Sequence, residues 1–402
     1  MNRLLVLLAI IIATMTGTLD GTASAVENPP TDAEHYTPIR LECIDPQANA
    51  RFGHAVDLDG AYLVVGTCYD EPGDTRPGRV YVYRQAGRRW APCARLQPGG
   101  GDTDPWFGWS VSISGSRVLV GTRGGPAYLF NGSGGSWKEE CRLAETSLAP
   151  DDQFGWSVSL DGDLAVVGSW ADAAWVYRLT DGHWGFEGML EPPAAAAFSG
   201  FGTSVAVDRE IILVGAPMDS AAGHWAGAAF VFSRDGDKWV PEGRLNASGT
   251  HPGEGFGKHV ALQGQVALVS APDAENHAGS CCIFRRSGTG WVEEAWLDTG
   301  CTRPGDLFGG SISIDGDCAV VGACGVGDDG WWGSGTVHVF SRRPEGWQRA
   351  AALTPPKHQK ECFFGYAVAL DGKRILVGAH CQDCPKAGEN AGTAYVFEAA
   401  GP

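Results

Sequence analysis

One unit recurs seven times along this chain of 402 residues, and this repetition constrains the fold more than any other feature. Each unit has a Phe-Gly pair placed 11 residues after a leucine, and its Phe lies 14 residues before the Gly or Ser that ends a second apolar run. Six units also carry a tryptophan six residues before the next leucine. Spacings this constant indicate a repeat architecture. The copies begin at Phe52, Phe107, Phe154, Phe201, Phe256, Phe308 and Phe364.

Each unit has the periodicity of β-strands. From Phe154 to Leu160 large apolar residues alternate with small or polar ones, which is typical of a strand buried on one side. Asp161-Gly162 then predicts a type I′ hairpin turn into a second strand. A third strand ends near an aromatic residue, and a fourth runs from the tryptophan to the leucine. Four antiparallel strands in about 50 residues predict one blade of a β-propeller.

The two ends of the chain indicate that the blades close into a ring. The seventh unit stops after its third strand, Tyr395 to Phe397, and lacks the strand from tryptophan to leucine. A matching strand, Thr37 to Leu41, stands in front of the first Phe-Gly. A terminal strand that completes the last blade leaves no open sheet edge. We therefore predict an all-β, seven-bladed propeller of four-stranded antiparallel blades over residues 37–398.

The first 25 residues have the features of a cleaved signal peptide: Arg3, a short apolar stretch, and Ala23-Ser24-Ala25. We expect residues 26–36 to be a linker and the mature protein to be secreted or periplasmic. No stretch reaches the 18 or so apolar residues that a membrane-spanning helix needs, so we predict no membrane insertion. The net charge of -17 disfavours binding to nucleic acid, which is itself polyanionic.

The repeated Phe-Gly-x-Ser/Ala-Val, the run Val214 to Pro217 (Val-Gly-Ala-Pro) and the run Gly227 to Phe232 together resemble the FG-GAP repeat. That repeat builds the seven-bladed propeller of integrin alpha subunits and of many exported bacterial proteins. The resemblance covers essentially the whole mature chain. It implies the same propeller fold.

The resemblance also implies a possible calcium site, because integrin-type blades often bind calcium between their first and second strands. Such a loop must supply six or more oxygen ligands. Here a two-residue hairpin joins these strands in every blade. Asp161 with Asp163, or Asp315 with Asp317, offers at most two carboxylates. We therefore predict no metal site and no cofactor, and we interpret these Asp residues as turn formers.

All 12 cysteines follow the predicted cleavage site. An even count in an exported protein predicts mainly disulfides. Three pairs recur in equivalent places, each joining a loop between blades to the variable loop of the next blade: Cys43 with Cys68, Cys301 with Cys324, and Cys362 with Cys381. The sequence does not pair the other six, which are Cys93, Cys141, Cys281, Cys282, Cys318 and Cys384.

The loop between the second and third strands carries nearly all of the length variation. From the Gly or Ser that ends the second strand to the third-strand aromatic, the offsets are 17, 9, 9, 17, 14, 18 and 19 residues. This loop and the connection between blades emerge on one face, so we predict that this face binds a partner. Tryptophans in these loops are the candidate ligand-binding residues, or alternatively lids over the blades: Trp170, Trp225, Trp331 and Trp332. Trp109 and Trp156, which follow a Phe-Gly, we interpret as packing between blades.

Neither a G-x-S-x-G nucleophile elbow nor an H-E-x-x-H motif is present, so we assign no catalytic residue. Our leading hypothesis is an exported, monomeric, non-enzymatic protein that binds an extracellular protein or glycan. Loop tryptophans favour sugar, and fungal lectins with an integrin-like propeller offer a precedent by resemblance. The alternative is a hydrolase or lyase at the mouth of the channel, which a cluster of carboxylates or histidines there would favour.

Overall fold

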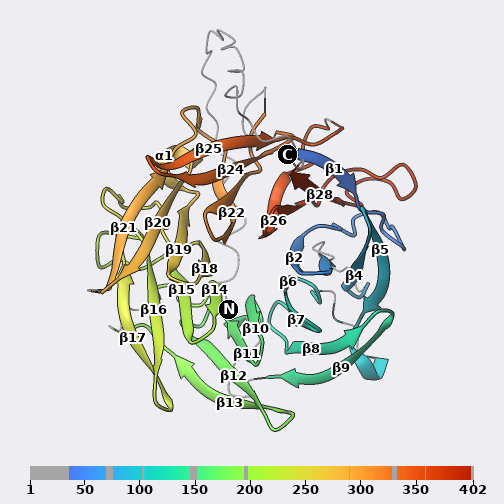
Figure 1. The fold of residues 1–402 in the computed structure, drawn as a ribbon, viewed down its shortest axis with the longest axis horizontal. Coiled ribbons are helices and arrows are strands. Elements are labelled where there is room, and N and C mark those ends of the chain that lie inside the picture. The colour runs from blue at the N-terminus through green and yellow to red at the C-terminus, as the bar shows by residue number, and fades with distance from the viewer. Residues whose placement is uncertain are drawn as a thin grey trace, which may run out of the picture.

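Alternating apolar residues make every unit fold as a four-stranded antiparallel sheet, and seven such sheets form a ring (Figure 1). This architecture comes from a computed structural model, which describes residues 36–68, 76–101, 104, 106–144, 152–193, 198–288, 290–327, 333–357 and 359–399. The predicted signal peptide lies outside the described residues, as does the predicted linker except for its last residue, Tyr36. Within the described residues, no helix is long and apolar enough to cross a membrane.

Blades 1 to 6 take their strands in chain order from the innermost to the outermost (Figure 1). Blades 1 and 2 consist of β2 (Ala55–Asp59), β3 (Tyr62–Thr67), β4 (Arg79–Ala86) and β5 (Arg89–Leu96), then β6 (Ser110–Ser114), β7 (Arg117–Gly121), β8 (Ala127–Ser133) and β9 (Ser136–Leu143). Blades 3 and 4 consist of β10 (Ser157–Asp161), β11 (Leu164–Gly168), β12 (Ala174–Thr180) and β13 (His183–Leu190), then β14 (Ser204–Asp208), β15 (Ile211–Ala216), β16 (Ala228–Asp235) and β17 (Lys238–Leu245). Blades 5 and 6 consist of β18 (His259–Gln263), β19 (Val266–Ala271), β20 (Ser280–Ser287) and β21 (Gly290–Leu297), then β22 (Phe308–Asp315), β23 (Cys318–Ala323), β24 (Thr336–Arg343) and β25 (Gly346–Leu353).

Blade 7 combines both ends of the chain, as predicted. Its first three strands are β26 (Phe364–Asp371), β27 (Arg374–Ala379) and β28 (Thr393–Ala399), and β1 (Tyr36–Arg40) supplies the fourth. The pairing of β1 with β28 is regular, whereas the third and fourth strands of every other blade are offset by a register shift. The closing strand is therefore held by the same antiparallel ladder, without the bulge that the covalent hairpins contain.

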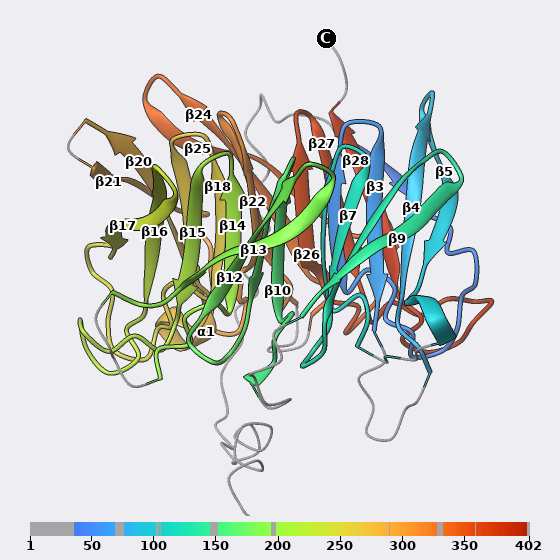
Figure 2. The same ribbon diagram turned by 90° about the horizontal axis from the view of Figure 1, so that it is seen from below.

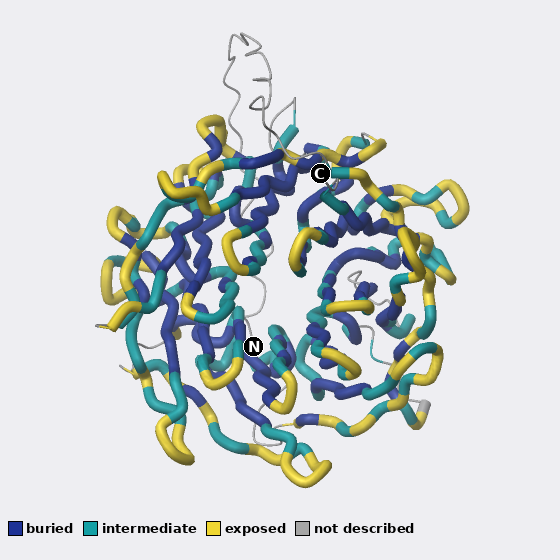
Figure 3. Tube along the Cα trace, in the orientation of Figure 1, coloured by how far each residue is buried: buried dark blue, intermediate teal, exposed yellow. Residues whose placement is uncertain are grey.

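The Phe-Gly pair packs one blade against the next. All seven Phe rings are buried; Phe201, for example, contacts the third-strand Phe232 edge to face at 5.9 Å between ring centroids. Glycine is required because the backbones nearly touch: a Cβ on Gly215 would lie 2.0 Å from the carbonyl oxygen of Gly257, which has φ of +93°. The six spaced tryptophans lie in the apolar clusters between blades, so they pack one blade against the next. Buried residues accordingly follow the strands, and exposed ones gather at the tips of hairpins (Figure 3).

The inner hairpins differ from the predicted turn type. Asp59 pairs with Tyr62, so the two turn residues are Gly60 and Ala61, and only Gly60 has a positive φ, of 57°. A type I′ turn needs positive φ at both positions, so that prediction is wrong, and the geometry fits type II′. In blade 4 the position with positive φ is occupied by Arg209 with φ of 55°, a conformation less favourable for a residue with a side chain than for glycine.

The residue before each turn connects neighbouring hairpins around the whole ring. Its side chain accepts a hydrogen bond from the first turn N–H of the next blade; the Gly115 N–H, for example, donates to Asp59 Oδ2 at 2.6 Å. All seven blades take part, blade 7 bonding to blade 1, and the acceptors are Asp59, Ser114, Asp161, Asp208, Gln263, Asp315 and Asp371. We call this closed set the hairpin ring. The aspartates are thus turn residues whose carboxylates also join the blades.

None of the twelve cysteines forms a disulfide in the structure, so the three predicted disulfides are not present in it. Cys362 and Cys381 are nonetheless close enough to interact: burial raises the pKa of Cys381 to about 11, and the charge of Cys362 adds to the rise. Burial likewise raises the pKa of Cys43, whose neighbouring thiol is Cys384. The oxidised pairing of the protein stays a prediction.

Candidate binding site on the variable-loop face

The innermost strand of each blade starts on the face of the variable loops, opposite the hairpin ring (Figure 2). The residue at this start directly follows Phe-Gly. It is aromatic in blades 7, 1, 2 and 3 and not in blades 4, 5 and 6, where Thr203, Lys258 and Gly310 stand. Because the ring places blade 7 beside blade 1, the four aromatic positions are consecutive: Tyr366, His54, Trp109 and Trp156.

These four side chains touch one another in sequence, and we call them the aromatic arc. Ring centroids are 5.3 Å apart from Tyr366 to His54, and His54 lies 4.8 Å from Trp109. Trp109 lies 4.8 Å from Trp156. Tyr366, Trp109 and Trp156 are half-buried, whereas His54 is buried beneath its neighbours. Four blades therefore share one continuous aromatic surface.

Two further pairs of rings extend the arc at its ends. Beyond Trp156, Trp170 lies at 5.4 Å and is followed by Phe198 at 6.3 Å. Beyond Tyr366, His380 lies at 3.9 Å and stacks on Phe363 at 5.5 Å. Phe198 is 54% exposed, so the extension beyond Trp170 ends in a ring that faces solvent.

The loop that carries Phe198 is fixed by one carboxylate. Asp172 accepts hydrogen bonds from the backbone N–H and the hydroxyl of Ser199, and from the backbone N–H of Phe201, all at 2.9–3.1 Å. Asp172 and Phe198 both have positive φ, of 56° and 58°. Three bonded donors hold this unusual backbone in place, so the exposed ring is presented in a defined position.

Arg123 brings a positive charge to the tryptophans of the arc. The Arg123 guanidinium lies 5.0 Å from the ring centroid of Trp106, 5.3 Å from that of Trp109 and 5.6 Å from that of Trp156, within cation–π range. The two histidines add no charge at neutral pH. Burial, helped by Arg51, lowers the pKa of His54 to about 4 and that of His380 well below its usual value.

Several carboxylates of this face are engaged in holding loops. Asp219 accepts from Arg244 at 2.5 Å and from the Ala221 N–H, and Asp273 binds Lys258 at 2.8 Å. Within the described residues, neither His54 nor His380 bonds to a carboxylate, and no three His, Cys, Asp or Glu side chains are grouped to hold a metal. The ring contacts of the arc suit stacking on a ligand.

The structure separates the predicted tryptophans. Trp170 belongs to the extension of the arc, but Trp225 does not: it is 49% exposed and its ring contacts His224 at 4.6 Å. Trp331 and Trp332 lie outside the described residues. Trp109 and Trp156 do contact across blades, as interpreted, yet both remain partly exposed.

Sequence reasoning missed His54, Tyr366, His380, Phe198 and Arg123. A signal for the first two was present in the repeat: the residue after Phe-Gly is aromatic in four units that a closed ring makes adjacent. The other three also stand at fixed offsets, Arg123 and His380 16 residues after the Phe of their units and Phe198 three residues before its Phe, but the residue type at these positions differs from blade to blade, so no pattern marked them.

Comparison with known families agrees with this architecture. The FG-GAP repeat model matches residues 40–83, 90–136, 137–178, 184–232, 291–340 and 347–397, which is well over half of the chain. Five of the six matches begin at or near the outer strand of one blade, and the first begins at Arg40, the last residue of β1. All six include the three inner strands of the blade that follows. The stretch 233–290 is unmatched, although it contains three strands of blade 5. A search among curated proteins found no match. The chain belongs to the FG-GAP repeat family.

Proposed function

We propose that this protein is an exported, non-enzymatic binding protein that holds an extracellular glycan against the aromatic arc. The observation that carries the proposal is the unbroken series of rings across four adjacent blades on the variable-loop face. Membership of a propeller repeat family supports a binding scaffold, and the arc supplies it with a surface suited to a ligand.

A sugar fits the chemistry of this surface. The C–H face of a pyranose ring packs on an aromatic face, while its hydroxyls need polar partners at the rim. Trp109 and Trp156 offer partly exposed rings at the centre of the arc, and Phe198 offers an exposed ring at one end. The Arg123 guanidinium, which lies against both tryptophans, supplies hydrogen-bond donors beside them.

The asymmetry of the face favours an elongated ligand over a ring-symmetric one. The aromatic positions occupy blades 7, 1, 2 and 3, whereas in blade 5 Lys258 is tied to Asp273 and blade 6 has only Gly310. A chain of several sugar units laid along the arc would contact Phe198, the central tryptophans and Tyr366 in turn. A ligand centred on the propeller axis would contact aromatic residues in only four of the seven blades.

Export is part of the proposal and is supported by the signal-like residues 1–25. An extracellular glycan is available only to a protein that leaves the cytoplasm. The acidic net charge of -17 keeps such a protein soluble and does not impede a neutral sugar.

A glycan array probed with the purified mature protein would identify the ligand class. The glycan bound most tightly is then titrated against the double variant Trp109→Ala/Trp156→Ala. We expect the double variant to bind about tenfold more weakly or worse, because two stacking faces are lost. Circular dichroism would check that it remains folded.

Trp225→Ala is the matched control, because Trp225 is an exposed tryptophan of the same face that does not contact the arc. We expect it to bind like the parent. Unchanged affinity in the double variant, or lost affinity only in Trp225→Ala, would contradict the proposal. A protein from secreted fractions that competes for the arc, with no glycan bound, would identify a protein as the partner instead.

A further inference from the structure

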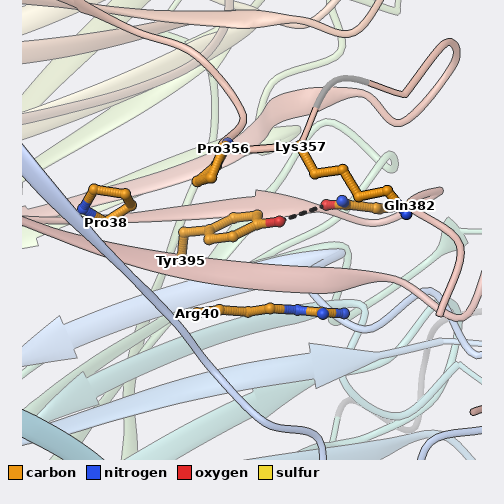
Figure 4. Close-up of a pocket in the computed structure, with 6 residues that line it drawn as sticks. All are labelled: Pro38, Arg40, Pro356, Lys357, Gln382 and Tyr395. Carbon is orange, nitrogen blue, oxygen red and sulfur yellow. Dashed lines mark hydrogen bonds between the residues drawn. The ribbon is translucent and has the colours of Figure 1, made fainter. Parts of the chain in front are cut away.

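A cavity of about 200 Å³ lies where the N-terminal strand closes the ring (Figure 4). It is distinct from the aromatic arc and is lined by Pro38, Arg40, Pro356, Lys357, Gln382 and Tyr395. These residues come from β1, from β28 and the loop before it, and from the connection between blades 6 and 7. Pockets for drug-sized ligands start near roughly 300 Å³, so this cavity suits one smaller molecule.

One amide in the lining has an N–H donor that no described residue uses. The Tyr395 hydroxyl donates to Gln382 Oε1 at 3.0 Å (Figure 4), and both residues are almost fully buried, with Gln382 only 2% exposed. Among the described residues no acceptor bonds to Gln382 Nε2. The buried polar atoms without a partner in the described part of the chain do not include Gln382 Nε2, so this N–H reaches the solvent of the cavity, where an acceptor atom of a ligand can bond to it.

Two cationic side chains complete the polar lining. Arg40 uses its Nε to donate to Thr393 Oγ1 at 3.1 Å, which leaves both terminal nitrogens without a partner among the described residues. Lys357 makes no hydrogen bond or ion pair with the described part of the chain. No carboxylate lines the cavity. Two cations without a counter-charge are notable on a protein of net charge -17.

We propose that this cavity binds a small organic carboxylate. Every unpaired nitrogen of the lining is a donor, so the ligand must bring acceptors and negative charge. The planar guanidinium of Arg40 matches a carboxylate in a paired, bidentate geometry, and Lys357 adds a point charge. Pro38, Pro356 and the Tyr395 ring form apolar walls that a compact ligand body contacts.

Such a ligand would also strengthen ring closure. Arg40 lies on β1, whereas Lys357 and Gln382 lie on segments of blade 7 and its preceding connection. A carboxylate that bonds to all three joins the closing strand to the rest of the ring. Because it binds only the closed, folded protein, it raises the free energy of unfolding as its concentration exceeds its Kd.

Isothermal titration and thermal unfolding of the mature protein with three probes test this. D-glucuronate carries the carboxylate on a compact body, D-glucose has the same ring without the charge, and inorganic phosphate has the charge without the body. We expect glucuronate to bind and to raise the Tm in a concentration-dependent way, with phosphate and glucose each about tenfold weaker or worse. Equal binding of glucose or of phosphate, or no binding of glucuronate, would overturn the proposal.

Lys357→Gln keeps the exposed side chain and removes its charge, so it should leave folding intact. We expect it to weaken glucuronate binding about tenfold and to reduce the Tm increase correspondingly. Lys238→Gln, the same change at an exposed position of blade 4, should bind glucuronate like the parent. If both variants kept the parent affinity, the carboxylate would not be held by this cavity.

Discussion

The two faces of this propeller are built from the same repeat and use it in opposite ways. On the hairpin face, the residue before each turn accepts a hydrogen bond from the next blade, and the seven bonds close the hairpin ring. On the variable-loop face, the residue after each Phe-Gly is a histidine, tyrosine or tryptophan in four blades. Its ring contacts other rings and, except at the buried His54, partly faces solvent.

The difference follows from where backbone donors are left unpaired. The inner strand of a blade has no strand on its channel side, so some of its N–H groups need side-chain acceptors from a neighbouring blade. The chain supplies them at the turn and also within the strand, where Asp57 accepts from Ile113 N–H at 2.7 Å and Ser159 accepts from Val207 N–H at 3.0 Å. Each acceptor sits at a fixed place in the repeat. On the loop face no repeated position has to supply such an acceptor, so the side chains there can differ between blades and bind a ligand.

The largest effect should come from opening the ring, on which both faces depend. Deleting residues 36–43 removes β1 and leaves the backbone of β28 unpaired along five residue positions. We expect loss of cooperative folding, or a fall in unfolding free energy of roughly 5 kcal/mol or more, because the exposed edge also uncovers the cluster around Leu41 and Val396. Thermal unfolding followed by circular dichroism measures this. A truncated protein with the parent Tm would show that the ring closes without this strand.

The second effect should be loss of stability in acid, arising partly at the loop face. Burial lowers the pKa of His54, His259 and His338 to about 4 and also lowers that of His380. Below pH 6.5 the unfolded chain binds protons that the folded chain does not, so stability falls as pH drops from 6.5 toward 4. Each such histidine contributes about 1.4 kcal/mol per pH unit. Urea unfolding at pH 7 and pH 5 measures the decrease.

Asp57 opposes this acid effect and offers a control. Burial raises its pKa to about 7 despite three hydrogen bonds to its carboxylate, so its contribution to stability is present at low pH and is lost as pH rises through 7. Asp57→Asn removes that titration and keeps an acceptor for the Ile113 N–H. The variant should therefore lose stability more steeply between pH 7 and pH 5 than the parent. A flat pH profile in both proteins would contradict the assignment of neutral, buried histidines.

A smaller effect should follow from breaking one link of the hairpin ring. Asp161→Ala leaves the Arg209 N–H without its acceptor at 2.5 Å and should cost about 1 kcal/mol of unfolding free energy. Asp161→Asn retains an acceptor oxygen and should cost less. Neither change should alter glycan affinity, because the two faces are separate. If Asp161→Ala bound the glycan more weakly at unchanged stability, the hairpin face would take part in binding, and the proposed separation of the two faces would be wrong.

The smallest effect should be a stabilisation. Arg209 occupies with φ of 55° a position that glycine takes in six of the seven inner hairpins. Arg209→Gly relieves this conformation and should raise the unfolding free energy by about 0.5–1 kcal/mol. Gly162→Arg, at the equivalent turn of blade 3, is the reverse change and should destabilise. Chemical denaturation of the pair measures both, and a destabilised Arg209→Gly would mean that the arginine side chain itself holds the turn.

Much of the fold was predictable because each blade repeats the same local requirements. In six blades the residue 14 positions after the Phe is a glycine that faces the Phe-Gly carbonyl of the next blade at a distance that no Cβ tolerates, and in blade 5 Ser270 takes this place. The turn type was predicted wrongly because Asp161-Gly162 suggested a local turn pair, whereas Asp161 serves a neighbouring blade. Trp225 shows that loop position alone does not predict a binding residue, because it lies in a variable loop as predicted and yet apart from the arc.

The sequence by itself determined the strands, the count of seven blades and the closure of the last blade by the first strand, since these depend on spacings along the chain. Only the tertiary structure decided which aromatic residues meet. Tyr366 and His54 are 312 positions apart in the chain, and their rings lie 5.3 Å apart because closure sets blade 7 beside blade 1. Likewise Arg40 and Lys357 border one cavity only after the ends of the chain join. Contacts between residues far apart in the chain depend on the closed ring. They can be predicted from the sequence only where the repeat places the same contact in every blade.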